Sequence, residues 1–344
     1  MRNRFLVFRR LTGVFVLVCS VNWRVAKDVV TPSPHLKFSS RRIVTEPMAS
    51  MITKSGKVSS RAEGFGEVLL IGATGRLGGM LRRHWPADDT LCCQSRQPLP
   101  GFVQFDLPAI GEQPSDAAIA AARGAQAIIC LAGITPARAG ANGALLNDNI
   151  SLALGALNLA ESAGVPRFLA ASSAAVYGAG EGPLTEDVTC MPVSDYGKQK
   201  LAMERALLEA SAAAAVTILR IGNVAGADAI LGGWQPEMRI DRFPDGRTPS
   251  RSYIGPITLA RVMHHLCFVE GLPRILNIAA PGAVQMGALL DAAGLDWQPK
   301  PAPASAIPEV RLDTNTLERH VDFAPENQTP AGLVSEWQQD MKKL

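Results

Sequence analysis

A short apolar segment that runs directly into a glycine-rich turn constrains the fold of this chain more than any other feature. Residues 67–71 predict a buried parallel strand, and residues 80–85 predict a helix. Between them lies Gly72-Ala73-Thr74-Gly75-Arg76-Leu77-Gly78-Gly79. Glycines spaced in this way permit a tight turn, close approach of the backbone to a pyrophosphate, and close packing of the helix. Free N–H groups at the helix start favour an anion, so the segment from Gly72 to Gly78 is predicted to bind a dinucleotide.

Alternating apolar and helical segments continue along the chain and predict an α/β fold. Further buried strands are predicted at 90–94, 102–105, 125–130, 166–171, 216–221 and 275–279. Strands that alternate with helices form right-handed βαβ units and a parallel sheet covered on both faces. We therefore predict a Rossmann-like doubly wound sheet over 65–226. Residues 227–344 are predicted to form a small substrate-binding portion with some segments returning to the core. Within it, 227–255 are loop-rich and 297–309 read as an extended linker.

The residues after the second strand indicate which dinucleotide is bound. An acidic residue about 20 positions past the glycines normally holds the adenosine ribose, but Ser95 and Arg96 stand there. Serine and arginine would bind a 2′-phosphate that a carboxylate would repel, and Arg76 could close on the same group. NADP is therefore predicted in preference to NAD. Asp106 is a candidate acceptor for the adenine amino group. The small residues of Leu131-Ala132-Gly133 would let the cofactor lie close.

A serine pair and a tyrosine–lysine pair follow the fifth predicted strand. Ser172 and Ser173 stand at its carboxyl end, where doubly wound sheets bind ligands. Tyr196 and Lys200 are four residues apart and so share one face of a predicted helix. A nearby ammonium lowers a phenol's pKa, which makes tyrosine usable as a general acid or base. This constellation predicts a catalytic site.

With these motifs the chain resembles the extended short-chain dehydrogenases/reductases of the NAD-dependent epimerase/dehydratase family, over about residues 66–343. The resemblance implies that Gly72, Gly75 and Gly78 contact the cofactor and that Ser173, Tyr196 and Lys200 are catalytic. It selects Ser173 over Ser172, because the family serine lies four residues before the tyrosine of Val176-Tyr177-Gly178. Asn149 matches the family asparagine that helps to position the active-site helix; an exposed amide on a helix surface is the alternative.

The same resemblance suggests substrate contacts and a reaction. It places Asn223 near the nicotinamide and substrate, and Arg251 where nucleotide-sugar members grip a pyrophosphate; a surface salt bridge is the alternative for Arg251. Ala174-Ala175 replaces the Asp-Glu pair of the sugar dehydratases, so dehydration is not expected. The leading hypothesis is an NAD(P)-dependent oxidoreductase that transfers hydride to or from a small carbonyl or hydroxyl substrate. A nucleotide-sugar epimerase and a non-catalytic NADP-binding sensor are the alternatives.

Charge is distributed unevenly and bears on partners and location. Residues 1–64 carry 12 Lys/Arg against 3 Asp/Glu, whereas residues 65–344 carry 22 against 28. A mildly acidic body disfavours nucleic acid as a partner. The apolar run over residues 11–21 of the basic leader is too short to span a bilayer as a helix. The leader is interpreted as a segment outside the mature fold, with Met48 or Met51 as a possible start; an export signal and an organelle transit segment are the alternatives.

The six cysteines lack Cys-x-x-Cys spacing, so neither a metal site nor a disulfide framework is predicted. Reduced buried thiols suit a cytoplasmic location. A homodimer is expected by analogy with the family, and no stable membrane insertion is expected.

Overall fold

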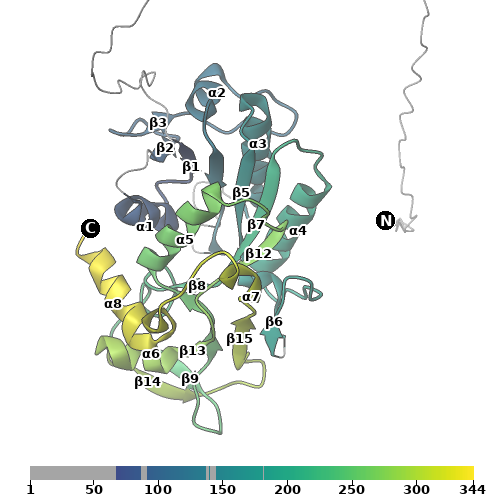
Figure 1. Ribbon diagram of the computed structural model, residues 1–344. Helices are drawn as coiled ribbons and strands as arrows, with labels where there is room; N and C mark the ends of the chain where they lie inside the picture. The colour runs from purple at the N-terminus through teal and green to yellow at the C-terminus, as the bar shows by residue number, and fades with distance from the viewer. Residues whose placement is uncertain (1–66, 87–90, 137–138, 140–144, 181) are drawn as a thin grey trace, which may run out of the picture. The chain divides into compact units, whose positions relative to one another are not determined.

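The computed structural model describes residues 67–86, 91–136, 139, 145–180 and 182–344 (Figure 1). The predicted basic leader, residues 1–64, lies outside the described residues, as do Met48 and Met51. In the described part of the chain, no helix is long and apolar enough to cross a membrane.

A seven-stranded parallel sheet forms the centre of the fold. Its strands are β1 (Val68–Ile71), β2 (Leu91–Ser95), β3 (Val103–Gln104), β4 (Ala127–Cys130), β5 (Arg167–Ser173), β7 (Ala215–Ile221) and β12 (Ile275–Ile278). The order across the sheet is β12-β7-β5-β4-β1-β2-β3. This confirms the predicted doubly wound sheet, whose order reverses between β1 and β4. Ligands bind such sheets at that reversal, outside the carboxyl ends of the strands.

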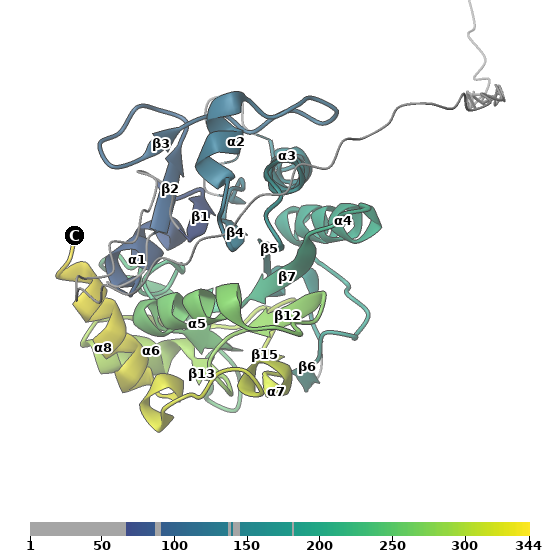
Figure 2. The same cartoon turned by 45° about the horizontal axis from the view of Figure 1, so that its top comes forward.

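Helices cover both faces of the sheet (Figure 2). They are α1 (Arg76–His84) and α5 (Pro256–Phe268) on one face, and α2 (Asp116–Ala122), α3 (Asp148–Ala163) and α4 (Asp195–Glu209) on the other. The strands are apolar at successive positions because both of their faces are buried. Thus Cys93 packs in the core beside Met80 of α1, whereas Cys92 packs in the core beside Ala118 of α2.

Local signals define where the two long helices begin and end. The hydroxyl of Ser194 accepts a hydrogen bond from the N–H of Gly197 at 3.1 Å and so caps the start of α4. Helix α3 ends at Gly164, which has a left-handed φ of 68°. The first turns of both helices lie at the carboxyl edge of the sheet, where Asn149 of α3 binds Ile134 after β4 and Tyr196 of α4 lies beside Ser173 of β5.

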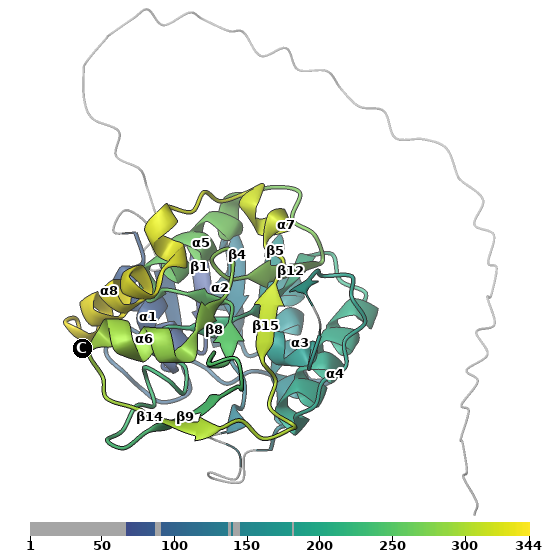
Figure 3. The same cartoon turned by 90° about the horizontal axis from the view of Figure 1, so that it is seen from below.

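Residues 227–344 contain more regular structure than predicted, and some of their strands pair with short strands from earlier in the chain (Figure 3). A four-stranded sheet has the order β13 (Val284–Gln285), β10 (Ser250–Arg251), β15 (Glu309–Leu312) and β6 (Pro183–Leu184). Two further pairs are β8 (Asn223–Val224) with β11 (Tyr253–Ile254), and β9 (Arg239–Arg242) with β14 (Gln298–Pro301). The remaining helices are α6 (Met286–Ala293), α7 (Asn315–Glu318) and α8 (Pro330–Met341), with short 3₁₀ turns η3 (Ala174–Val176) and η4 (Pro325–Gln328).

The prediction of a plain linker over 297–309 was therefore wrong. Strand β14 pairs with β9 although it contains Pro299 and Pro301. The residues on either side of the prolines donate instead: Gln298 N–H to Met238 O at 2.8 Å, and Ala302 N–H to Arg242 O at 3.1 Å. Proline is tolerated in a strand where its nitrogen is not needed for the ladder.

Helix α8 ties the end of the chain to the first helix of the sheet. Asp340 accepts two hydrogen bonds from Arg83, at 2.7 and 2.8 Å, and lies 3.0 Å from His84 Nε2. The Asp340 side chain is 2% exposed. A buried carboxylate held in this way is costly to lose, because its cationic partners remain in place.

We predict that Asp340→Asn lowers the free energy of unfolding by about 2 kcal/mol, because Arg83 loses a charged partner in a partly buried site. Urea unfolding followed by circular dichroism measures this. The exposed pair Arg247–Asp245 provides the control, since Asp245→Asn should leave the unfolding midpoint unchanged. Equal effects of the two substitutions would contradict the prediction.

Candidate active site

The glycine-rich turn joins β1 to α1 with very little free space. Gly72 has a φ of 82°, and a Cβ there would lie 2.7 Å from Ala132 N. A Cβ at Gly78 would lie 2.5 Å from Gly72 O. Helix α1 begins at Arg76, and its N-cap residue Gly75 makes no side-chain cap. Because glycine has no side chain, no N-cap side chain accepts hydrogen bonds from the amides of the first turn. An anion-binding helix start needs such uncapped amides, so the turn fits the pyrophosphate of a dinucleotide.

The end of β2 forms the next part of the candidate cofactor site. Ser95 is buried, and its hydroxyl accepts a hydrogen bond from Gln97 N–H at 3.1 Å. Arg96 is exposed, and no side-chain partner is found for it among the described residues. Arg76 is also exposed and donates to Ala227 O at 3.3 Å. Asp106 is exposed just after β3.

Gln94 is a residue that the sequence analysis did not single out. Its amide donates to Phe105 O at 2.7 Å and its oxygen lies 3.4 Å from Gly72 N. The buried side chain thus connects the glycine turn to the segment after β3. A buried glutamine beside a glycine turn is recognisable only once the parallel pairing of β1 with β2 is known.

The segment after β4 lies between the glycine turn and the predicted catalytic residues. Ala132 lies against Gly72, and a Cβ at Gly133 would lie 2.7 Å from Asn149 Oδ1 and 3.3 Å from Lys200 Nζ. Asn149 is fully buried rather than exposed on the helix surface. Its amide group donates to Leu146 O and Ile134 O, and its oxygen accepts from Ile134 N–H. It therefore fastens α3 to the segment that follows β4.

Ser173, Tyr196 and Lys200 meet at the carboxyl end of β5. The hydroxyls of Ser173 and Tyr196 are hydrogen-bonded, and Ser173 Oγ also accepts from Ala175 N–H at 3.2 Å. Lys200 Nζ donates to Ala171 O at 2.8 Å. Ser172 lies next to Ser173 on the strand but binds Glu204 at 2.5 Å. The two serines therefore have different partners, and Ser173 is the one beside Tyr196.

Burial dominates the proton affinities in this cluster. It raises the pKa of Tyr196, and the hydrogen bond with Ser173 partly opposes the rise. It lowers the pKa of Lys200 to about 8, while Cys130 and Glu204 act in the opposite direction. The expectation that Lys200 lowers the pKa of the phenol is not met in this arrangement. The physical reason is that the ammonium is directed to Ala171 O, and burial outweighs any attraction between the two groups.

The predicted substrate contacts lie in two short strands outside the central sheet, β8 and β10. The Asn223 side chain is hydrogen-bonded to Tyr253, whose hydroxyl donates to Asp228 at 2.9 Å. Arg251 donates to Ser250 O at 2.7 Å and to Ile307 O at 3.1 Å, and burial lowers its pKa. No carboxylate in the described part of the chain pairs with Arg251. Direct contact between Arg251 and the group formed by Ser173, Tyr196 and Lys200 is not found there either.

Two further features limit the chemistry of the site. Ala174 and Ala175 form η3 directly after Ser173, so this turn offers no carboxylate for elimination. The described residues contain no group of three His, Cys, Asp or Glu that could hold a metal ion.

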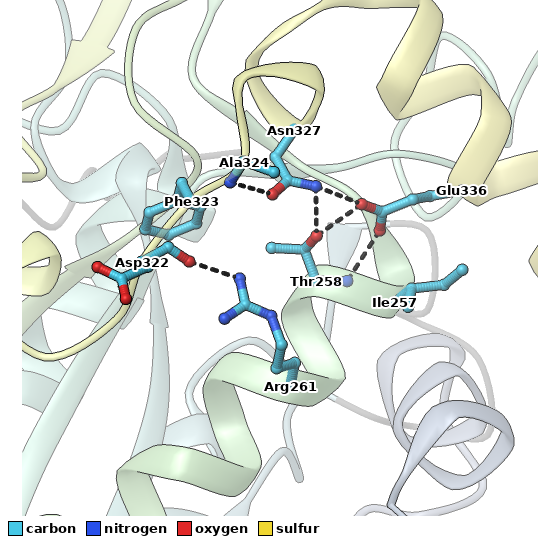
Figure 4. A pocket seen from close by; sticks show the side chains of 8 residues that line it. All are labelled: Ile257, Thr258, Arg261, Asp322, Phe323, Ala324, Asn327 and Glu336. Atoms are coloured by element: carbon cyan, nitrogen blue, oxygen red, sulfur yellow. Dashed lines mark hydrogen bonds between the residues drawn. The ribbon is translucent and has the colours of Figure 1, made fainter.

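A separate hollow of about 540 Å³ lies beside the start of α5 (Figure 4). Its polar groups bind one another: Glu336 of α8 accepts from Thr258 N–H at 2.8 Å and from the Thr258 hydroxyl at 2.6 Å. Asn327 donates to both side chains at 3.0 Å. None of the predicted site residues lines this hollow. Glu336 caps α5, and we assign the group a structural role.

The fold and this cluster define an extended short-chain dehydrogenase/reductase. A family model described as "NAD dependent epimerase/dehydratase family" matches residues 68–243, and the chain belongs to that family. This confirms the resemblance seen in the sequence.

Known relatives support the assignment over different lengths. A UDP-glucose 4-epimerase of Azospirillum brasilense is 42% identical over 84 residues, which is 24% of each chain. The chain thus matches about a quarter of that relative's length. The solved structure of MoeE5 in complex with UDP-glucuronic acid and NAD has a TM-score of 0.61 at 22% identity, covering 80% of this chain and 99% of MoeE5. The UDP-glucose 4-epimerase of Thermus thermophilus in complex with NAD has a TM-score of 0.59 at 19% identity, over 79% and 98% of the two chains. These structures show the shared fold.

We predict that Gly78→Ala weakens NADH binding by about 10-fold, because the added methyl meets backbone atoms of the turn and must push α1 away from β1. A fluorescence titration with NADH measures this. Gly79→Ala is the matched control, because its Cβ would meet no backbone and only the Arg83 side chain, at 3.1 Å from an Nη1 that makes no bond to Asp340. Equal affinity in the two variants would count against a dinucleotide at this turn.

Proposed function

We propose that the protein is a nucleotide-sugar epimerase that oxidises a sugar carbon transiently and reduces it again. The main support for hydride-transfer chemistry is that Ser173, Tyr196 and Lys200 lie together beside the glycine turn. The choice of a nucleotide sugar over a small carbonyl rests on the likeness to UDP-glucose 4-epimerases. In this respect the comparisons favour the alternative in our sequence analysis over its leading hypothesis.

The chain offers a suitable place for the nicotinamide cofactor that this reaction needs. The turn from Gly72 to Gly78 would hold the pyrophosphate, because any Cβ at those two glycines would collide with backbone. Lys200, whose Nζ lies 3.3 Å from the position of a Cβ at Gly133, would stand at the nicotinamide end. When bound, the cofactor would supply a reversible acceptor for hydride.

Tyr196 is the proposed acid–base residue. It would take the proton from the substrate hydroxyl as the carbon loses hydride, and return it when hydride comes back to the opposite face. Ser173, hydrogen-bonded to Tyr196, would orient the same oxygen. Because burial raises the pKa of Tyr196, the positive charge of Lys200 is needed nearby to favour phenolate during turnover.

Arg251 is the proposed contact for the diphosphate. Its guanidinium is half-buried and donates only to backbone carbonyls among the described residues. A partly buried cation without a counter-charge is unfavourable, and a diphosphate would provide that charge. Dehydration is a poorer proposal, because Ala174 and Ala175 supply no acid or base after Ser173.

We predict that the protein interconverts UDP-glucose and UDP-galactose without net change in nicotinamide absorbance, and that Tyr196→Phe lowers kcat about 10³-fold through loss of proton transfer. Chromatography of the nucleotide sugars measures turnover. NADH binding by the variant, which should be retained, controls for folding.

A reductase of small carbonyl compounds is the second candidate, favoured by the lack of an acidic residue at the end of β2. Net oxidation of NADPH by small carbonyls, with no epimerised product, would support it and contradict the epimerase. Unaltered cofactor binding with no turnover of either substrate class would instead favour the sensor.

The cofactor form is a separate proposal. The solved relatives described above contain NAD, yet exposed Arg96 is suited to a 2′-phosphate. We predict that Arg96→Ala lowers NADPH affinity about 10-fold and leaves NADH affinity unchanged, since only the phosphate would use the guanidinium. Calorimetric titration of both cofactors measures this. Arg123, which is exposed at the end of α2, gives the control variant Arg123→Ala. Equal losses for the two cofactors would contradict the prediction.

A further inference from the structure

Helix α4 contacts the end of β5 at three successive turns. Tyr196, Lys200 and Glu204 are each four residues apart and so share one face of the helix. Tyr196 is hydrogen-bonded to Ser173, and Lys200 donates to Ala171 O at 2.8 Å. Glu204 accepts a hydrogen bond from Ser172 Oγ at 2.5 Å. Three consecutive strand residues thus anchor three turns of the helix. The proposed reaction uses the first two anchors and gives no role to the third.

The third anchor is a buried ion pair between the helix and the neighbouring strand. Arg220 of β7 donates to Glu204 Oε2 at 2.8 Å from Nη2, and from Nε to both carboxylate oxygens at 3.2 Å. The side chains of Arg220 and Glu204 are 4% and 1% exposed. Ser172 and Arg220 are direct partners across the β5–β7 pair. Glu204 therefore spans a cross-strand pair at the edge where the site is built.

Arg220 also connects this ion pair to residues that follow β5 and to strand β12. Its Nη1 donates to the Tyr177 hydroxyl and to Glu186 O, both at 3.0 Å. The Tyr177 hydroxyl in turn donates to Asn277 Oδ1 of β12 at 2.8 Å. The carboxyl ends of β5, β7 and β12 are thereby joined to α4 (Figure 2).

A contribution to folding stability does not by itself explain why a charged residue stands at position 204. Replacing a buried ion pair by well-packed apolar residues is often neutral or stabilising. A carboxylate on the face of α4 that carries the tyrosine and the lysine does what an apolar residue cannot: it fixes the helix by directional hydrogen bonds and places negative charge one turn from Lys200. We propose that Glu204 is a positioning residue that holds α4 in register with β5 and keeps Lys200 charged in its buried site.

The charges around Lys200 give this role a direction. The groups around the Lys200 ammonium come from several elements. Glu204 and Tyr196 share its helix, and Cys130 of β4 faces it. The neutral amide of Asn149 on α3 lies near the ammonium, and Arg220 of β7 is paired with Glu204. Glu204 and Cys130 raise the pKa of Lys200 against the effect of burial. Removing the carboxylate would remove this support and leave Arg220 unopposed, and both changes lower the pKa. Lys200 would then lose its proton at a lower pH.

The role in the reaction rests on the proposed function, but the test of Lys200 does not. In protein labelled with ¹³C-lysine, the Lys200 signal, assigned with Lys200→Met, is titrated by NMR. We expect Glu204→Gln to lower its midpoint by about one pH unit. The alkaline limb of the kcat profile for epimerisation should shift equally. Asp340→Asn, which breaks another buried ion pair, should leave the Lys200 midpoint unchanged.

An unchanged Lys200 midpoint in folded Glu204→Gln would overturn the proposal, whether or not the protein turns over nucleotide sugars. Absence of epimerase activity with a shifted midpoint would refute the proposed function alone. If Glu204→Gln does not fold, Ser172→Ala removes the hydroxyl and keeps the ion pair. Hydrogen exchange of the α4 amides should then become about 10-fold faster than in Asp340→Asn. Exchange rates equal to those of Asp340→Asn would overturn the registering role.

Discussion

The burial of the Lys200 ammonium is the constraint on which the arrangement of the site depends. A charge that is 5% exposed must be compensated by nearby acceptors or lose its proton. Here Ala171 O accepts its hydrogen bond and Glu204 contributes negative charge. The glycine at 133 leaves the space that the ammonium occupies, since a Cβ there would lie 3.3 Å from Nζ. One cation thus contacts the backbone of β5, the glycine that follows β4 and the carboxylate of α4.

Interactions that repeat along the backbone were predictable from the sequence. The strand, the glycine turn and the helix at 67–85 could be predicted from an apolar run and from glycines whose spacing is typical of a turn where backbone segments approach closely. The choice of Ser173 over Ser172 came from the family pattern, and the structure accounts for it: Ser173 lies beside Tyr196, whereas the hydroxyl of Ser172 donates to Glu204. The pair β9–β14 could not be predicted, because it joins segments far apart in sequence and one of them contains two prolines.

The pKa values of the site residues could not be predicted from the spacing of these residues in the sequence. A separation of four residues correctly places Tyr196 and Lys200 on one helix face, but it does not tell how deeply that face is buried. Burial raises the pKa of the tyrosine and lowers that of the lysine, so burial shifts both groups toward their neutral forms. The same spacing also puts Glu204 on this face, yet its importance emerges only from Ser172 and Arg220, which belong to two other strands.

The two ends of the site constrain the reaction unequally. At the β2 end, Ser95 and Arg96 stand where a carboxylate would repel a 2′-phosphate, so this end supplies no group that would select against NADP. The ribose end therefore does not separate an epimerase from a reductase. At the other end, Arg251 has its guanidinium donors on two backbone carbonyls while its charge remains uncompensated among the described residues. A small neutral carbonyl would leave that charge as it is, whereas a diphosphate would neutralise it. The uncompensated charge of Arg251 is consequently in keeping with the nucleotide sugar proposed above, which combines a diphosphate with an oxidisable sugar carbon.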